Sequence, residues 1–364
     1  MPAHPLAVLS VGFISGVGST AEASCAAIRC GINSFQETQF IGRDGELLVG
    51  SAVVLEEPWR GIVKLAKMVA RAITECFAAT DDAQPDQVPV LVCIAEVERP
   101  GRFEGLTPMI LDNIERELGS RLHPHSRVLE QGRVGATVAL LQARRMLLGG
   151  RHRRVIVAGV DSFLSGATLA AYDRQDRLLR RGNSNGFIPG EAAAAVVLAA
   201  WDEATPTPLL VRGLGFAREP APLDSGRPLR ADGLVQAIQA ALAEAEVALK
   251  ECDHRIADMN GEQYWFKEAA LAVTRVLRDR KVLLSLWHPA DCIGEVGAAT
   301  VPVMLAILYY GARKDYLPGP LFLGHIGNDD DKRAAFVTQA LTAQALALEV
   351  RAETEFRRQR RIGG

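Results

Sequence analysis

The feature that most constrains the fold is a run of small residues ahead of a β-branched apolar segment. It reads NSNGFIPGEAAAAVVLA over residues 183–199. The alanines and the valines after them predict a buried strand over residues 192–198. Gly186, Gly190 and residues 192–195 allow backbones to approach where larger side chains would clash. The pattern indicates either a tightly layered core or, as the alternative, an ordinary hairpin leading into a core strand.

Length and composition place the chain among large globular proteins. With 364 residues, 48% of them hydrophobic, it is long enough for two domains or two fused halves. The net charge of −2, from 41 basic and 43 acidic residues, gives no overall attraction to nucleic acid or anionic membranes. We therefore expect neither nucleic acid nor membrane as a partner.

Cysteines and the N-terminal segment indicate the compartment. The six cysteines are scattered, and no C-x-x-C pair occurs, which argues against a disulfide framework or a zinc site. The apolar run at residues 6–14 is too short to cross a bilayer and follows no basic segment. We expect a cytoplasmic protein with reduced thiols.

Predicted strands alternate with predicted helices in two successive series, which favours parallel sheets. A polar, proline-rich stretch, WDEATPTP at residues 201–208, separates the series. We predict an N-terminal half over residues 1–203, a C-terminal half over 204–345 and a charged tail over 346–364. The predicted strands are 6–13, 89–95, 155–159, 192–198, 209–216, 256–259, 282–287, 321–325 and 334–339, and the predicted helices are 21–30, 62–77, 106–118, 134–148, 233–249, 265–277 and 298–311.

Five blocks in chain order resemble the β-ketoacyl (3-oxoacyl-acyl-carrier-protein) synthases of the thiolase superfamily, over about residues 6–340. The blocks are VLSVGFISGVGSTAEASCAAIRCGINSF, RRMLLGGRHRRVIVAGVDS, NSNGFIPGEAAAAVVLA, DHRIADMNGEQYWFKEAALA and IGEVGAATVPVML. The resemblance implies the α/β thiolase fold, in which two similar βαβαβαββ halves form a five-layered α-β-α-β-α arrangement. It also implies a homodimer formed through a central strand.

The resemblance further implies a catalytic cysteine at a helix N-terminus and two histidines, and this chain differs at all three places. The cysteine position falls on Arg133 or, with the gap placed differently, on Gly132. The first histidine position falls on Asn260, and the second falls on Gly294 or Glu295. Because a covalent step needs a nucleophile, we expect a catalytically degenerate protein with no catalytic residue.

Several side chains are expected to converge where the catalytic residues would lie. Arg133 and Glu295 could form a buried ion pair that fills the old cavity, or a new acid/base pair. Cys292 follows His288 by four residues, so either a Cys–His arrangement or an inert loop thiol is open. The ligand-pocket candidates are Gln131, Arg133, Asn260, Cys292 and Glu295.

Other chemistry-bearing residues receive structural interpretations. His123 and His125 flank Pro124 in the stretch HPHS, but no third metal ligand is apparent in the sequence. Ser162, in GVDSF, lacks an evident base and is interpreted as a turn residue. We expect no metal and no cofactor.

Three functions are compatible with this sequence. The first is a non-condensing ketosynthase-like pseudoenzyme that acts as a protein-binding scaffold or accessory protein, with residues 97–107 or the basic tail as contacts. It would form a homodimer, or a heterodimer with a ketosynthase-like chain, and bind a carrier protein or a secretion effector or adaptor. Thiolase-like accessory proteins of this kind also occur beside type VI secretion effectors, where an effector-loading role is expected from resemblance.

The two alternatives keep a small molecule in the pocket. One is an active 3-oxoacyl synthase-type enzyme that condenses or decarboxylates acyl thioesters, for which Gln131 lies close to the nucleophile position. The other is an acyl or small-ligand binding module with an open apolar pocket leading to Arg133, whose guanidinium would hold a carboxylate or phosphate.

Overall fold

The computed structural model describes residues 4–79, 84–202, 205, 207–279, 281 and 283–341. Its strands are β1 (Leu6–Ser15), β2 (Gln36–Ile41), β3 (Leu47–Gly50), β4 (Val90–Ile94), β5 (Arg127–Glu130), β6 (Val155–Ser162), β7 (Glu191–Ala200), β8 (Leu209–Arg218), β9 (His254–Ala257), β10 (Ser285–Trp287), β11 (Leu321–Gly327) and β12 (Lys332–Ala340). Its α-helices are α1 (Ala21–Arg29), α2 (Gly61–Ala78), α3 (Leu106–Leu118), α4 (Gly135–Leu148), α5 (Gly166–Arg174), α6 (Asp232–Ala245), α7 (Gln263–Val276), α8 (Ala290–Ile293) and α9 (Thr300–Arg313). Short 3₁₀ turns lie at Gly132–Val134, Leu249–Glu251 and Gly297–Ala299.

The main sheet carries an internal duplication. Its strands are hydrogen-bonded in the order β10-β9-β11-β12-β8-β1-β7-β6-β4-β5. From the centre outward, the N-terminal half has the order β1-β7-β6-β4-β5 and the C-terminal half has the order β8-β12-β11-β9-β10. When the strands of this sheet are numbered within each half, the two orders are the same. The halves join where residues 6–8 of β1 pair antiparallel with residues 209–211 of β8. The predicted boundary between residues 203 and 204 falls on residues outside the described part, between β7 and β8, and stays a prediction.

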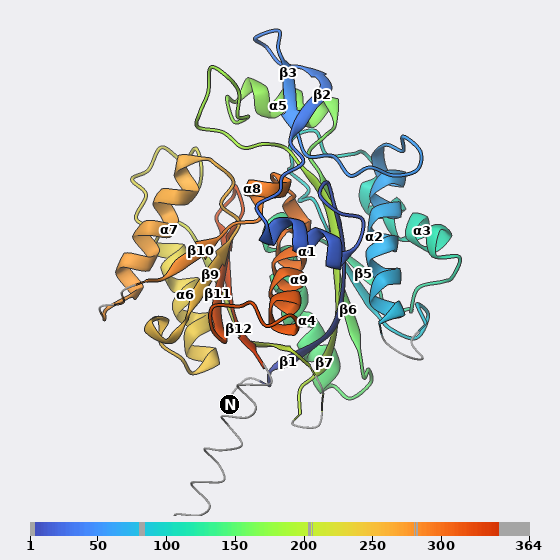
Figure 1. The fold of residues 1–364 in the computed structure, drawn as a ribbon, viewed down its shortest axis with the longest axis vertical. Coiled ribbons are helices and arrows are strands. Elements are labelled where there is room, and N and C mark those ends of the chain that lie inside the picture. Colours follow the sequence, from blue (N-terminus) through green and yellow to red (C-terminus); the bar gives the residue numbers. More distant parts are fainter. Residues whose placement is uncertain are drawn as a thin grey trace, which may run out of the picture.

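The prediction of parallel sheets is correct only for the outer strands. β4 pairs parallel with β5 and β6, and β9 pairs parallel with β10 and β11. The pairs of β7 with β1 and β6, and of β12 with β8 and β11, are antiparallel. The expectation fails for the last two strands of each half because no helix packed on the sheet connects them: α5, between β6 and β7, projects from the body (Figure 1), and only a short turn joins β11 to β12.

The layers are plain in Figure 1. Helices α2 and α3 cover the outer face of the N-terminal half-sheet, and α6 and α7 cover the outer face of the C-terminal one. Helices α4 and α9 lie between the half-sheets and pack on strands of both. Residues from these two helices and the inward faces of both half-sheets form one continuous hydrophobic cluster. The centre is therefore dry and closely packed.

The alanine run forms the buried part of β7, between α2 on one side and α9 on the other. A Cβ atom at Gly190, just before this strand, would lie 2.1 Å from the Ile293 carbonyl oxygen, and one at Gly12, in the neighbouring β1, would lie 1.9 Å from that of Ala72. Small residues are needed because backbones of adjacent layers touch. The hairpin alternative is therefore wrong.

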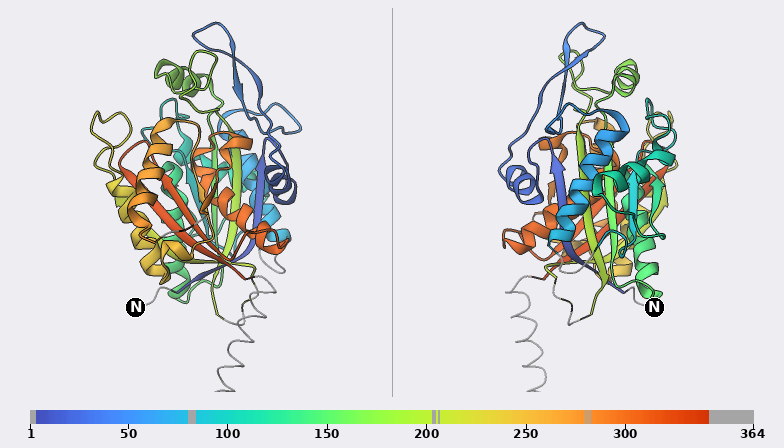
Figure 2. Two further views of the ribbon diagram at one scale, coloured as in Figure 1. Left: turned by 60° about the vertical axis from the view of Figure 1, so that its left-hand side comes forward. Right: turned by 90° about the vertical axis from the view of Figure 1, so that its right-hand side faces the viewer.

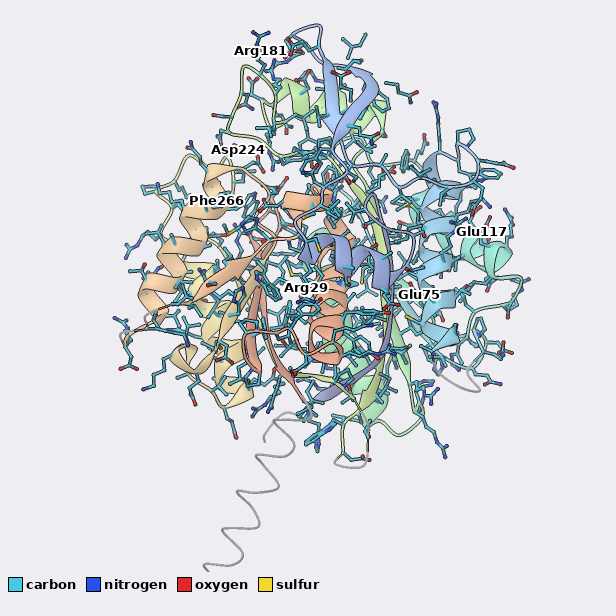
Figure 3. All side chains as sticks on the ribbon, viewed as in Figure 1. Arg29, Glu75, Glu117, Arg181, Asp224 and Phe266 are labelled. Carbon is cyan, nitrogen blue, oxygen red and sulfur yellow. The ribbon has the colours of Figure 1, made fainter. Side chains whose placement is uncertain are left out.

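The first helix is tied to these layers by one carboxylate. Glu75 of α2, labelled in Figure 3, accepts hydrogen bonds from the backbone N–H of Phe13 at 2.9 Å and of Ala21 at 2.8 Å. Phe13 lies in β1 and Ala21 begins α1. A single half-buried carboxylate thus joins β1, the start of α1 and the covering helix α2.

Some elements escape sequence prediction. The β2–β3 hairpin projects from the body together with α5, as Figure 2 shows. Strand β2 consists of mostly polar residues that are exposed or half-buried, and β3 has only four residues, so neither gives a clear apolar period. Strand β5 has only four residues, which is too short for periodicity to reveal.

Two further expectations concern the tail and membranes. The charged tail predicted at residues 346–364 lies outside the described residues. Within the described part of the chain, no helix combines the length and the apolar character needed to cross a bilayer.

The close approach of β1 to α2 leads to a stability prediction. We expect Gly12→Ala to lower the free energy of unfolding by about 1–3 kcal/mol, because the added methyl group overpacks a rigid backbone contact. Gly182→Ala is the matched control, since a Cβ there meets nothing within 4 Å. Urea denaturation measures both variants. Equal stability of the two variants would contradict the layered packing.

Candidate functional site

The two central helices begin at facing turns. Gly132 opens the 3₁₀ turn before α4 and Gly297 opens the one before α9, with φ of 56° and 49°. The two turns contact each other at the middle of the molecule. A Cβ on Gly132 would lie 2.2 Å from a carboxylate oxygen of Glu96. The first candidate for the cysteine position thus has no side chain and no room for one unless Glu96 moves.

Arg133 is buried and held by acidic groups from several elements. Its Nη1 donates to Glu295 Oε2 at 3.1 Å, and its Nη2 donates to Asp329 Oδ1. Its Nε lies 4.0 Å from Asp258 Oδ2. The guanidinium also stacks over the Trp265 ring, 4.5 Å from the ring centroid. These contacts orient the charge, and each of the two Nη atoms donates to a carboxylate of the protein itself.

Glu295 links the three positions at which the resemblance places catalytic residues. Its Oε2 accepts from Arg133 and also from Asn260 Nδ2, the latter at 2.7 Å. Its Oε1 accepts from the backbone N–H of Gly297 at 2.9 Å. The ion pair expected between Arg133 and Glu295 is present.

A second guanidinium enters from the loop after α5. Arg177 binds Glu262 with two parallel hydrogen bonds, Nε to Oε1 at 2.7 Å and Nη2 to Oε2 at 2.8 Å. Its Nη1 donates to Asp329 Oδ2 at 2.5 Å. Asp329 is therefore shared between Arg133 and Arg177. Such bidentate, charge-assisted contacts are the strong form of this interaction.

A third guanidinium closes the cluster from the loop after β4. Arg99 donates to Asp161 at 2.9 Å and to Glu96 at 2.9 Å, and it lies over the Phe163 ring. Asp161 also accepts from the backbone N–H of Ala298 at 2.9 Å. We call the whole set the arginine–carboxylate cluster: Arg99, Arg133, Arg177, Glu96, Asp161, Asp258, Glu262, Glu295 and Asp329.

The arginine–carboxylate cluster fills the space it surrounds. The cavity bounded by Arg99, Arg133, Arg177, Asn260 and their neighbours measures about 10 Å³, which is room for about one water molecule. The open pocket expected beside Arg133 is therefore wrong. Guanidinium groups and aromatic rings occupy the volume that an acyl chain would need.

Two acidic groups of the cluster have shifted pKa values in opposite directions. Burial opposes ionisation of Asp329, but Arg133 and Arg177 outweigh it and hold its pKa well below the usual range. Burial raises the pKa of Asp258 to about 7, reinforced by Glu295 and only partly offset by Arg133. One cluster thus contains a strongly ionised carboxylate and one that titrates near neutrality.

The remaining predicted residues lie elsewhere. The carbonyl oxygen of Gln131 accepts from Asn328 Nδ2 at 3.0 Å. Gly294 follows α8 with φ of 71°, and its backbone approaches Ile188. Cys292 does not join the pocket, because α8 turns its sulfur towards α1, where Sγ lies 4.0 Å from the Ile28 carbonyl oxygen. It lines a separate cavity of about 390 Å³ together with His288.

The cysteines show no sign of activation. All six lie within the described residues, and every one except Cys30 is buried. Burial raises the pKa of the thiols of Cys25, Cys76, Cys93, Cys252 and Cys292. An activated nucleophile needs the opposite shift.

Ser162 has a partner that the sequence did not reveal. Its Oγ donates to Glu191 Oε1 at 2.7 Å and accepts from the Leu164 N–H at 3.1 Å. Glu191 is also ion-paired with Lys64. These groups border a cavity of about 550 Å³ that is also lined by Trp59. The expectation that Ser162 lacks a basic partner is wrong, because the Glu191 carboxylate accepts its hydroxyl proton in a hydrogen bond. Its interpretation as a turn residue is wrong as well, because Ser162 is the last residue of β6.

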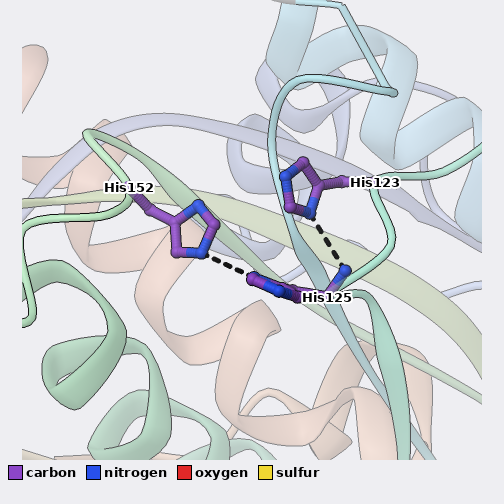
Figure 4. Close-up of side chains that lie close together, drawn as sticks. All are labelled: His123, His125 and His152. Atoms are coloured by element: carbon purple, nitrogen blue, oxygen red, sulfur yellow. Dashed lines mark hydrogen bonds between the residues drawn. The ribbon is translucent and has the colours of Figure 1, made fainter.

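His123 and His125 have a third histidine as a neighbour. His152, in the turn between α4 and β6, lies beside His123 and His125, as Figure 4 shows. The expectation that these residues lack a third metal-ligating neighbour is therefore wrong. The sequence hid the contact because 27 residues separate His152 from His125.

Most residues of the arginine–carboxylate cluster were not predicted from the sequence. Asp258, Asn260 and Glu262 alternate after β9, and Asp329 follows the glycine-asparagine turn after β11. Acidic residues at strand ends are a usable signal. Nothing local in the sequence marks Arg99 or Arg177 as their partners.

Comparison with known proteins identifies the architecture. No family model matches the sequence, and no curated protein matches it. Solved structures do. A chain of the ketosynthase–chain length factor complex from Xenorhabdus doucetiae matches with a TM-score of 0.77 and 12% identity, over 93% of this chain and 98% of that chain. The chain has the ketosynthase fold.

Two other ketosynthase structures agree. The ishigamide ketosynthase/chain length factor matches with a TM-score of 0.73 and 15% identity, over 93% of this chain and 100% of that chain. A type II polyketide acyl-carrier protein bound to its ketosynthase provides another match, with a TM-score of 0.75 and 13% identity over 94% and 100%. The predicted α/β thiolase-type fold is confirmed.

Because the arginine–carboxylate cluster is buried, we expect removal of the Arg133 charge to lower the stability of the protein strongly. We expect Arg133→Met to lower the free energy of unfolding by about 3–5 kcal/mol, because Glu295 would remain buried without its cation. Arg181→Met is the matched control: its side chain is 86% exposed and pairs with Glu46 at 3.5 Å, so its loss costs about 0–1 kcal/mol. Urea denaturation measures both. A similar small loss for both variants would show that Arg133 is not confined as described.

Asp258 predicts a pH dependence of stability. In the folded protein it keeps its proton up to about pH 7, whereas an unfolded aspartate releases it near pH 3.9. Between these values the unfolded state binds fewer protons. The free energy of unfolding therefore falls as pH rises, by up to about 1.4 kcal/mol per pH unit, and levels off above about pH 7.

Asp258→Asn removes this titration and should flatten that part of the stability curve. The amide oxygen can still accept the hydrogen bond that Gly327 N–H donates at 2.8 Å. Asp330→Asn, at a half-exposed side chain, is the control. Denaturation at pH values between about 4 and 8 measures all three proteins. Parallel curves for the wild type and Asp258→Asn would refute the raised pKa.

Proposed function

We propose that this protein is a non-condensing ketosynthase-like partner protein, which keeps the fold but forms no acyl-enzyme. The observation that carries the proposal is the arginine–carboxylate cluster at the positions where the resemblance places the cysteine and both histidines. Arg133, Asn260 and Glu295 are bound to one another there.

The chemistry of these side chains argues against a covalent step. A guanidinium stays protonated in proteins and has no lone pair to offer a thioester. Gly132 has no side chain at all. Because the space beside Arg133 measures about 10 Å³, a thioester carbonyl cannot reach the cluster without displacing its ion pairs.

The charge of the cluster argues against decarboxylation as well. Decarboxylation of a malonyl thioester develops negative charge, which an enzyme stabilises with donors aimed at it. Here six acidic residues surround three arginines, each of which already donates to at least two of these carboxylates. Asn260 donates to Glu295 and not into an open site.

A ketosynthase-like chain is the proposed partner. Matching structures contain a ketosynthase with its chain length factor, or with an acyl-carrier protein. In this chain β5 lies at one end of the described sheet order, and an edge strand can pair with a strand of another chain. Val97 and Met109, 59% and 48% exposed, lie on segments that follow β4 and begin α3. A second copy, a carrier protein and a secretion effector or adaptor remain other possible partners.

The first test is acylation of the purified protein. After incubation with acetyl-, malonyl- and longer acyl-carrier-protein or coenzyme A thioesters, we expect no added mass by intact mass spectrometry and no carbon dioxide release. An active ketosynthase run in parallel shows that the thioesters are competent. An acyl group on any residue bordering the cluster would refute the proposal.

The second test is assembly. We expect co-expression with the source organism's ketosynthase-like chains to give a one-to-one complex by light scattering. Val97→Asp combined with Met109→Asp should weaken it by about tenfold or more, because burying two charges at an interface is costly. Phe266→Asp, at a ring 42% exposed on α7, should not. Recovery of only a homodimer or only a carrier-protein complex would replace the proposed partner.

A further inference from the structure

Three imidazoles gather at the end of the molecule opposite to the arginine–carboxylate cluster. His123 and His125 lie in the turn that leads into β5, and His152 lies in the turn between α4 and β6. The cluster begins where β5 ends and α4 starts. The histidines and the arginine–carboxylate cluster therefore lie at opposite ends of β5 and of α4.

The geometry of the three rings is regular. Their centroids lie 5.1, 5.1 and 5.0 Å apart, and the ring planes are inclined by 66°, 88° and 87°. One potential ligand nitrogen from each ring lies within 4.8 Å of the others. His125 Nδ1 and His152 Nε2 are 2.9 Å apart, as Figure 4 shows. Three imidazole nitrogens this close together form the donor set of a three-histidine metal site.

The backbone holds the two turns in place. His123 N–H donates to the Pro85 carbonyl at 3.1 Å, and Ser126 N–H donates to the His123 carbonyl at 2.8 Å. Ser126 Oγ accepts from the Val90 N–H at 2.9 Å, which fixes the turn against β4. Pro124 restricts the backbone between the two histidines. Two of the three ligands are thus positioned before any ion binds.

We propose that His123, His125 and His152 bind a divalent transition-metal ion of the zinc type, with water in the fourth position. Zinc takes imidazole nitrogens at about 2.0–2.1 Å in tetrahedral geometry, which sets the nitrogens about 3.3 Å apart. The observed separations need only side-chain adjustments to reach that value. His125 is exposed and the other two rings are half-buried, so water can reach the ion.

The surroundings contain both favourable and unfavourable charges. Burial and the neighbouring imidazoles lower the pKa of His123 and His152, and the neutral ring is the form that binds metal. Asp86 lies near His123 and favours a cation, whereas Arg151 beside His152 opposes one. A bound ion would connect the start of β5 with the start of β6, across β4.

The test is zinc titration of the full chain, without an oligohistidine tag, after treatment with a chelator. Calorimetry with zinc chloride should give one equivalent bound, and zinc should raise the melting temperature. His152→Ala should weaken binding by at least about tenfold, because even loss of an outer-shell partner weakens metal binding about 10–100-fold. Circular dichroism checks that the variant folds.

Two control variants address competing ligands. His288→Ala removes the imidazole beside Asp291 and Cys292, and Cys30→Ser removes the exposed thiol; both should bind zinc like the wild type. The proposal fails if the wild type binds no zinc, if His152→Ala binds as tightly as the wild type, or if either control loses the site.

Discussion

The contact on which the centre of this molecule depends is Arg133 held between Glu295 and Asp329. Arg133 lies in the 3₁₀ turn before α4 in the N-terminal half, whereas Glu295 precedes α9 and Asp329 follows β11 in the C-terminal half. One guanidinium therefore connects elements of both half-sheets at the point where the two central helices begin. Arg177 shares the Asp329 carboxylate with Arg133. Arg99, with its own carboxylates, borders the same small cavity as Arg133.

Placing charges at this point has a physical consequence for function. Helices α4 and α9 direct their N-terminal N–H groups at the centre, and acceptors are stabilised there: Gly297 N–H donates to Glu295, and Ala298 N–H donates to Asp161. In this chain carboxylates of the protein itself satisfy the donors and arginines neutralise the carboxylates. Close packing of small residues between the layers and the ion pairs of the cluster both stabilise this centre.

The sequence predicts the architecture far better than the site. Alternating strands and helices indicated an α/β chain but predicted parallel pairing throughout, whereas the layered fold was implied by the resemblance of five blocks in chain order. The glycines and alanines near β7 agree with that fold because close packing of layers depends on local residue size. The prediction that Arg133, Asn260 and Glu295 converge came from block order. The places of Arg99 and Arg177 in the cluster could not be predicted, since Asp161 is 62 residues from Arg99 and Glu262 is 85 residues from Arg177 in sequence. His152 was missed for the same reason, and the short β5 for lack of any periodic signal.

The most direct test of the account is a crystal structure of the protein soaked with a stable pantetheine-linked acyl thioester analogue. The account predicts that Arg133 stays between Glu295 and Asp329, and that no analogue occupies the space among Arg99, Arg133 and Arg177. An acyl chain lying in that space, with Arg133 swung out of its ion pairs, would contradict it.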